Sequence, residues 1–275
     1  ISAAGGGTVY LAAGTYTVDS SIVVPSGVTL IGDGRTATII QLGNFGATSI
    51  NLNAMNITGA NNITIRDLAV DGRSDRNSAG VQNGIYASTT ASSGALITSI
   101  KVSRFINDGL YSNVALTASR ITNSLFTSNS NGISVSNADN LLVHGNEASS
   151  NSNQGIVIGG INVIVTSNTV KNNANYGIRG FVSSYGIFSN NSSTGTQATG
   201  IFIKGSGNNT ISNNIITGAS SSSIFLSNDT SNNTVSNNTL GGVAILDLAT
   251  GTVYANQLDI NGKLITKSDG GAVVQ

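Results

Sequence analysis

The sequence of 275 residues contains no cysteine, no tryptophan, one proline and one histidine, and only 9% of its residues are charged. Without cysteine, neither a disulfide framework nor a thiolate metal site can form, and with one histidine no transition-metal site is expected. The net charge is zero and there is no basic cluster, which argues against nucleic acid or an anionic membrane as the main partner. No apolar run approaches the ~20 residues of a membrane span, so no membrane-spanning helix is expected. Solubility must therefore come from hydroxyl and amide groups.

A short phrase, glycine followed by an aliphatic residue, returns seven times with 22 to 25 residues between successive starts. In the last copy serine replaces the glycine. The copies begin at Gly84, Gly109, Gly132, Gly155, Gly177, Gly200 and Ser223. A fixed period in this range is typical of a solenoid, in which each unit buries its apolar face only against its neighbours.

The unit from Gly132 to Gln154 indicates which kind of solenoid this is. Apolar and polar residues alternate in short runs, which is the period-two pattern of β-strands. Clusters of Asn, Asp, Ser and Gly separate these runs and predict turns. One unit is therefore expected to contain three strands and three turns, and no helix.

Two further series of residues repeat with the same period. The residue after each opening glycine is Ile or Leu, which predicts a buried aliphatic column. Asparagines follow the second strand of successive units and predict an internal Asn ladder, in which each amide bonds to the next. They are Asn123, Asn146, Asn168, Asn190, Asn213 and Asn237. Together these series predict an all-β, single-domain parallel β-helix of roughly ten coils with about 23 residues per coil.

The phase of the repeat divides the chain into three parts, with no linker between them. Residues 1–60 are rich in strand formers but off the period, so they predict irregular N-terminal coils. Regular coils are expected over 61–240, and 241–275 predict final coils or a cap over the open end, as the edge of a solenoid requires. Two insertions, 71–83 and 88–96, interrupt early coils. Because they fall on consecutive coils, we expect them to lie side by side.

The opening residues 5–16, GGGTVYLAAGTY, resemble the start of the pectate-lyase-like right-handed β-helix superfamily. Residues 65–72, IRDLAVDG, and the units after them resemble the catalytic modules of mannuronan C5-epimerases and related tail-spike depolymerases. This resemblance covers most of the chain and implies right-handed winding. It also implies a capping helix before the first coil, of which only residues 1–4 are candidates, so we expect the chain to be a piece of a longer protein. The shared motifs belong to the fold rather than to a chemistry.

The residues that catalyse epimerisation in the resembled family are absent. Epimerase modules carry Tyr-Gly-Phe-Asp-Pro-His on the catalytic strand, whereas this chain has DGLYSN over residues 108–113. Only the glycine matches, and on the next unit Asn131 replaces an acidic residue of the family. The paired aspartates of polygalacturonases and the calcium-binding aspartates of pectate lyases are also missing from adjacent units. The resemblance therefore does not carry epimerase activity over to this chain.

If the residue after each opening glycine faces the core, the residue after that one faces outward. The outward column is Tyr86, Tyr111, Ser134, Val157, Arg179, Phe202 and Phe225. Sugar rings stack on aromatic faces with flanking amides, and arginine pairs with uronate carboxylates. The alternative, that the rings only stabilise the strands by packing across them, stays open for the Tyr pair and the Phe pair.

The turn before the strand of Tyr111 carries an aspartate, and this places an acid beside the outward tyrosines. Asp108, Tyr111 and Tyr86 are therefore the candidate catalytic residues, because a tyrosine can serve as base or acid in β-elimination on a uronate. The first insertion is expected to form a wall over the same face. The candidate substrate-binding residues are Arg73, Asp75, Arg76, Arg179 and Phe202. The alternative is that the carboxylate and the loop charges are merely solvated.

Two functions from different classes fit these observations. The first is a secreted protein that binds polysaccharide along the outward column, and as an enzyme it would be a lyase, an epimerase or a glycoside hydrolase. The second is a non-catalytic surface or fibre component, such as an adhesin or a tail-spike shaft, with a homotrimer or a filament neighbour as candidate partner. Both place the chain outside a cell or on a cell or virion surface. No cofactor or metal is expected, although calcium on turn carboxylates stays open without a spaced Asp motif to support it.

Overall fold

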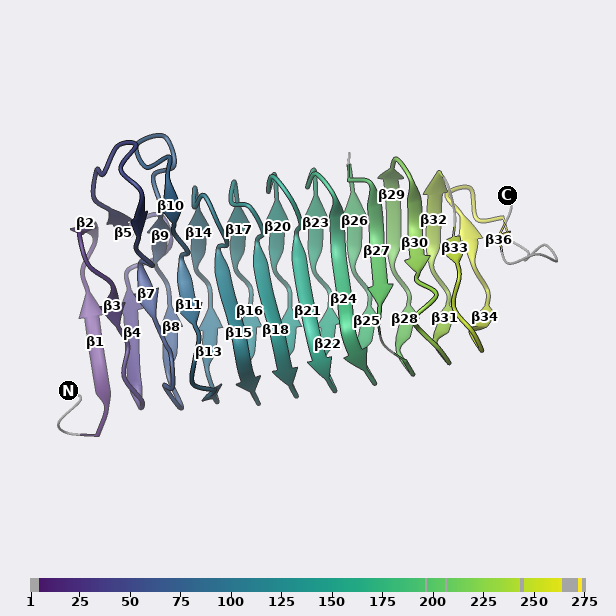
Figure 1. Cartoon of the computed structure of the whole chain (residues 1–275), viewed down its shortest axis with the longest axis horizontal. Coiled ribbons are helices and arrows are strands. Elements are labelled where there is room, and N and C mark those ends of the chain that lie inside the picture. The colour runs from purple at the N-terminus through teal and green to yellow at the C-terminus, as the bar shows by residue number, and fades with distance from the viewer. Residues whose placement is uncertain (1–4, 196, 206, 243–244, 264–271, 274–275) are drawn as a thin grey trace.

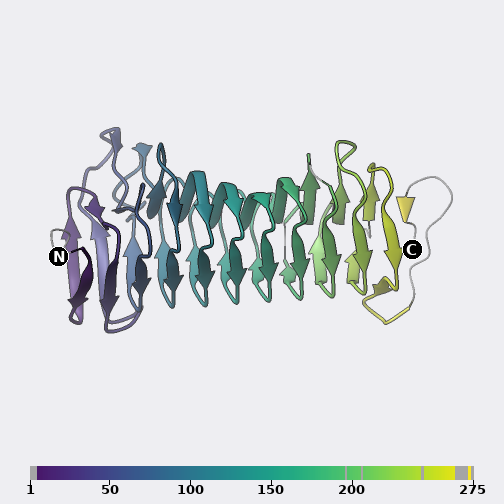
Figure 2. The same cartoon turned by 90° about the horizontal axis from the view of Figure 1, so that it is seen from below.

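The computed structural model describes residues 5–195, 197–205, 207–242, 245–263 and 272–273, and within these ranges it consists of strands and turns without helix. The chain winds into coils stacked along one axis (Figures 1 and 2). Each regular coil contributes one strand to each of three sheets, so neighbouring strands come from successive coils and run parallel. Among the described strands, only the last pair of the third sheet, β33 (Ile245–Asp247) with β36 (Ala272–Val273), is antiparallel. The predicted all-β parallel β-helix with three strands per coil is confirmed, with about 11 turns. The described residues contain no helix that could cross a membrane.

Three sheets make up the walls of the solenoid. Sheet 1 holds β1 (Gly7–Leu11), β4 (Val28–Gly32), β8 (Thr64–Arg66), β13 (Leu96–Thr98), β16 (Arg120–Thr122), β19 (Leu142–His144), β22 (Ile164–Thr166), β25 (Ile187–Ser189), β28 (Thr210–Ser212), β31 (Thr234–Ser236) and β34 (Val253–Ala255). Sheet 2 holds β2 (Gly14–Val18), β5 (Thr38–Leu42), β9 (Ala69–Asp71), β14 (Lys101–Ser103), β17 (Leu125–Thr127), β20 (Glu147–Ser149), β23 (Thr169–Lys171), β26 (Ser192–Thr194), β29 (Ile215–Ala219), β32 (Thr239–Gly242) and β35 (Leu258–Asp259). Sheet 3 carries the repeated phrase and holds β3 (Ile22–Val23), β7 (Met55–Asn56), β11 (Ile85–Ala87), β12 (Ser92–Ser93), β15 (Leu110–Thr117), β18 (Ile133–Asp139), β21 (Ile156–Ile161), β24 (Tyr176–Ser184), β27 (Thr199–Lys204), β30 (Ser222–Leu226), β33 (Ile245–Asp247) and β36 (Ala272–Val273). A separate ribbon pairs β6 (Ile50–Asn51) with β10 (Gly80–Val81).

The aliphatic column that follows the repeated glycine lies in the core, as predicted. Ile85 pairs with Leu110, Leu110 with Ile133, and the register continues through β21, β24 and β27 to Ile224. Each of these side chains is at most 1% exposed. The central residues of the three-residue strands in the other two sheets, such as Phe126 and Val143, fill the remaining interior. One continuous apolar core therefore holds the three sheets together.

A column of buried amides runs through the turn between sheets 1 and 2, but not at all of the predicted positions. Its members are Asn146, Asn168, Asn191, Asn214, Asn238 and Gln257. Asn146 donates to Oδ1 of Asn168 from its backbone N–H at 2.9 Å and from its Nδ2 at 3.1 Å, and this pairing recurs along the column. The other four predicted positions are wrong by one residue, because each of them precedes the buried column.

Those four asparagines have a different role in the same turn. Asn123, Asn190, Asn213 and Asn237 have φ angles of 49°, 56°, 55° and 55°. This is the left-handed region, which asparagine enters more readily than most residues because its short polar side chain can bond locally. The turn needs one left-handed residue followed by one buried residue. Asn123 is followed by the buried Ser124, and each of the other three is followed by a buried asparagine.

The prediction that the two insertions lie side by side is wrong. Residues 72–84 connect sheet 2 to sheet 3 and lie beside residues 43–54 of the preceding coil, where Asn77 Nδ2 donates to Gly43 O at 3.0 Å. Residues 88–95 leave the opposite end of β11, where β12 pairs with β15. The two insertions belong to different corners of the coil and are therefore separated by the width of sheet 3. Figure 1 shows the loops beside β10 rising above the regular coils.

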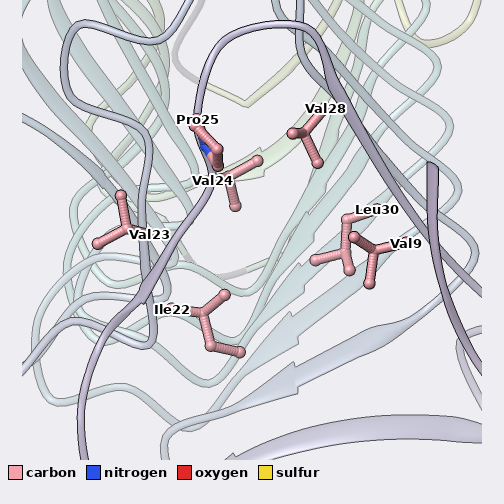
Figure 3. Close-up of a pocket in the computed structure, with 7 residues that line it drawn as sticks. All are labelled: Val9, Ile22, Val23, Val24, Pro25, Val28 and Leu30. Atoms are coloured by element: carbon pink, nitrogen blue, oxygen red, sulfur yellow. The ribbon is translucent and has the colours of Figure 1, made fainter. Parts of the chain in front are cut away.

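Among the described residues, the first coil of the solenoid leaves an apolar pocket at its N-terminal end. Val9, Ile22, Val24 and Leu30 contribute to this pocket of about 120 Å³ (Figure 3). Val23 at its rim is 67% exposed. In the described part of the chain no coil precedes β1, β2 and β3, so these strands are edge strands.

Candidate functional site

Tyr86 and Tyr111 lie side by side on the outer face of sheet 3, as predicted. They are paired in the register of β11 and β15, and their rings stack with centroids 5.7 Å apart and planes at 14°. Both point outward because the residue before each of them points into the core, and side chains alternate along a strand. The pair presents a stacked aromatic surface to solvent.

A pocket of about 270 Å³ opens beside these rings, at the start of β11 and β15. Its lining residues are Val81, Asn83, Tyr86, Asn107, Asp108 and Tyr111. The structure therefore brings the three candidate catalytic residues into one pocket. The two asparagines were not predicted from the sequence, nor was Val81, which comes from the first insertion and contributes part of the wall.

Asp108 occupies a position that amides occupy on the neighbouring coils. Its backbone N–H donates to Oδ1 of Asn83 at 3.0 Å, and Nδ2 of Asn131 donates to Oδ1 of Asp108 at 2.8 Å. The column continues along the solenoid axis, to Asn53 on the preceding coils and to Gln154 on the following ones. Asp108 is only 7% exposed. A carboxyl group thus stands within an amide column at the floor of the pocket.

This setting changes the acidity of Asp108. Burial raises the pKa of Asp108, and hydrogen bonds from Asn131 and Ser134 offset part of the rise. Burial also raises the pKa of Tyr111, with further contributions from Tyr86 and from the charge of Asp108. At neutral pH the Tyr111 phenol is therefore protonated. The pocket combines a phenol donor with an acid that keeps its proton to a higher pH than a surface aspartate does.

Replacing Asp108 by asparagine is expected to raise the free energy of unfolding at pH 7 by on the order of 1 kcal/mol, because the buried charge is removed and the amide column is completed. A carboxyl group whose pKa is higher in the folded chain binds its proton more tightly there. Its ionisation therefore destabilises the fold as the pH rises above the ordinary range of aspartate. Urea unfolding from pH 3 to pH 8 measures this gain, which should shrink towards zero at the acid end. A gain that does not vary with pH contradicts the assignment.

The three candidate substrate-binding residues of the first insertion, Arg73, Asp75 and Arg76, lie at the corner between sheets 2 and 3. Asp75 accepts from Nη1 of Arg104 at 3.0 Å and pairs with Nε of Arg76 at 3.4 Å. Arg104, which is not among the predicted site residues, also binds both carboxylate oxygens of Asp71. Because Arg104 follows β14, the ion pairs that it makes hold the insertion to the same corner of the next coil. Among the described residues none of them joins the insertion to the pocket.

A second aromatic cluster lies further along the outer face of sheet 3. Arg179 on β24 and Phe202 on β27 are paired in the register, as predicted. Phe202 stacks on Phe225 with centroids 4.7 Å apart and contacts Tyr176 at 4.8 Å. Tyr176 was not predicted from the sequence, because it is the first residue of β24 and lies one position before the repeated phrase. The described residues contain no group of three His, Asp or Glu side chains that could hold a metal ion.

A family described as "Right handed beta helix region" matches residues 50–192, 83–240 and 117–274. The chain belongs to this family. Its membership confirms the right-handed winding that the resemblance implied. A search of curated protein sequences finds no significant match.

Several solved structures share this right-handed β-helix over nearly the whole chain. The A-module of a mannuronan C-5 epimerase from Azotobacter vinelandii has 19% identity and a TM-score of 0.71, over 100% of this chain and 92% of that one. DFA-IIIase from Arthrobacter chlorophenolicus A6, in complex with GF2, has 13% identity and a TM-score of 0.65, over 97% and 82% of the two chains. ORF18 of Geobacillus virus E2 has 16% identity and a TM-score of 0.56, over 96% of this chain and 58% of that one. At these identities the likeness establishes the fold alone.

Proposed function

We propose that this protein is an extracellular polysaccharide-interacting β-helix whose binding surface is the outer face of sheet 3. The pocket of Tyr86, Asp108 and Tyr111 is the centre of that surface. The observation that carries the proposal is the carboxyl group of Asp108, buried in a column of amides beside two stacked tyrosine rings. An amide at this position would serve the fold better, so a destabilising acid next to a pocket favours a functional role.

The chemistry of the pocket suits a sugar. Stacked aromatic rings offer the apolar face that a pyranose ring covers, and Asn83 and Asn107 offer amide groups to its hydroxyls. An acid with a raised pKa can protonate a leaving oxygen, and the Tyr111 phenol can donate a hydrogen bond to the same atom. If the protein is catalytic, we assign Asp108 as the general acid and Tyr111 as the donor that assists it. Structural neighbours named as an epimerase, a pectate lyase and DFA-IIIase support a carbohydrate ligand by analogy of fold.

Replacing both Tyr86 and Tyr111 by alanine is expected to weaken polysaccharide binding at least tenfold, because each lost aromatic contact contributes about 0.5–1.5 kcal/mol beyond its buried area. Affinity electrophoresis against alginate, pectin and capsular glycans identifies the ligand, and calorimetry gives the dissociation constants. The matched control replaces Tyr10 and Tyr16, which are 58% and 37% exposed at the N-terminal end. Unchanged binding by the Tyr86 and Tyr111 variant removes the pocket from consideration.

A non-catalytic fibre or surface component is the second candidate, and one observation favours it. Oδ1 of Asp108 accepts both the backbone N–H and Nδ2 of Asn131, so the carboxylate takes part in the column as an amide oxygen does. Product assays on any bound glycan, by absorbance of unsaturated uronates and by release of reducing ends, separate the two candidates. If turnover is absent in the wild type while Asp108→Asn binds as well as the wild type, the role is structural or purely adhesive.

A further inference from the structure

Arg179 lies within cation–π distance of three aromatic rings. Its Cζ lies 5.3 Å from the ring centroid of Phe181, 5.8 Å from that of Phe202 and 6.0 Å from that of Tyr176. Such contacts use the faces of the rings and fix the position of the guanidinium group. They do not use its N–H groups as hydrogen-bond donors, because these groups donate in the guanidinium plane. The rings therefore hold Arg179 in place while its hydrogen-bonding capacity stays available.

No carboxylate of the described residues lies within ion-pair distance of Arg179. Its Nε is buried and has no hydrogen-bond partner. Arg104 shows the contrast on the same solenoid, since it binds both Asp71 and Asp75. Buried donors are normally paired, and an unpaired one is costly to the folded protein. The site therefore has an uncompensated charge and at least one donor without an acceptor.

The position of Arg179 relates it to the pocket. Tyr111 and Arg179 belong to the same outward column of sheet 3, and β18 and β21 lie between their strands. Three strand spacings of about 4.8 Å place them about 14 Å apart along the solenoid axis. Ser134 and Val157 occupy the column between them and carry no charge. A linear polymer lying along this face meets the tyrosine pair and then Arg179.

We propose that Arg179 and its three rings form a binding site for an anionic substituent of a glycan, either a carboxylate or a sulfate ester. This inference rests on the proposed function and adds a charge preference to it. Both substituents present coplanar or clustered oxygens that a guanidinium fork binds with two donors. Phe202 is buried beneath this site, and Phe225, which is half-buried and stacks on Phe202, supplies the apolar surface for the sugar ring that bears the substituent.

Three polymers with one backbone test this site: dextran, carboxymethyl-dextran and dextran sulfate. The wild type is expected to bind at least one charged form about tenfold more tightly than dextran, since a hydrogen-bonded charge pair contributes that much or more. The stronger of the two charged forms identifies the substituent. Arg179→Met should abolish the preference and Arg179→Lys should retain only part of it. Arg120→Met, which removes the same charge from the exposed face of sheet 1, should keep it.

The result also separates this site from the pocket. Equal affinity of the wild type for all three polymers, or a preference that survives in Arg179→Met, overturns the anion site. A preference lost equally in Arg120→Met also overturns it, because the effect then comes from net charge. The proposed function stands in all three cases if glycan binding is still lost in the Tyr86 and Tyr111 variant. Thermal unfolding of each variant verifies that the solenoid is intact, which is expected because Arg179 points away from the core.

Discussion

Replacing Asn168 by alanine is expected to lower the free energy of unfolding by about 3 kcal/mol, because several buried groups lose their partners at once. Nδ2 of Asn168 donates to the carbonyl of Val143 at 2.9 Å and to Oδ1 of Asn191 at 3.0 Å. Its Oδ1 accepts the backbone N–H and the Nδ2 of Asn146. Alanine replaces none of these interactions, and no described coil can shift to satisfy them without breaking register. Urea unfolding followed by circular dichroism measures the loss.

The matched control is an asparagine of the same turn outside the column. Asn123 is exposed and has a φ of 49°, so Asn123→Gly keeps the backbone conformation and should change stability by less than about 1 kcal/mol. If Asn168→Ala is no more destabilising than Asn123→Gly, the buried amides are not a main source of stability. Stability would then come from the aliphatic core alone.

The period of the chain predicts the fold well because one requirement is repeated on every coil. Ile133 and Ile156 face the same interior from equivalent positions, so the same residue type returns at a fixed interval. The amide column was harder to locate because Asn190 and Asn191 are adjacent and chemically identical. Only the backbone shows that the first is left-handed and the second buried. A second amide column at Asn129, Asn151 and Asn173 has intervals of 22 residues and could have been found by the same reasoning.

The candidate site was predictable to the extent that it follows the strands. Tyr86, Asp108 and Tyr111 meet because each has a fixed offset from the repeated glycine. The wall of the pocket and the ion pairs at the corner were not predictable, since insertions do not follow the period. Phe181 was predictable by the same reasoning, because it follows Arg179 by two residues on β24 and therefore lies on the same face of the strand.

Replacing Gly155 by alanine is expected to destabilise the solenoid by up to about 3 kcal/mol through overpacking, which makes the repeated glycine a packing requirement. A Cβ at this position would lie 2.6 Å from the carbonyl oxygen of Gly177 on the next coil and 2.8 Å from Nδ2 of Asn173. Neither atom can move freely, because the first belongs to a sheet backbone and the second to a buried amide column. Gly155 is not among the residues of positive φ, so its conformational freedom is not the reason for its presence.

The last copy of the phrase provides the control for this prediction, because it carries a side chain where the others have none. Ser223 accommodates a Cβ, and its Oγ donates to the carbonyl of Gly241 at 3.1 Å. Ser223→Ala should therefore cost no more than about 1 kcal/mol, the value of one hydrogen bond. Guanidinium unfolding of both variants measures the difference. Equal stability of Gly155→Ala and the wild type would contradict this prediction, because the coils could then separate by the width of a methyl group. The spacing between coils, which places Tyr86 beside Tyr111 and Arg179 beside Phe202, would in that case be variable and not fixed.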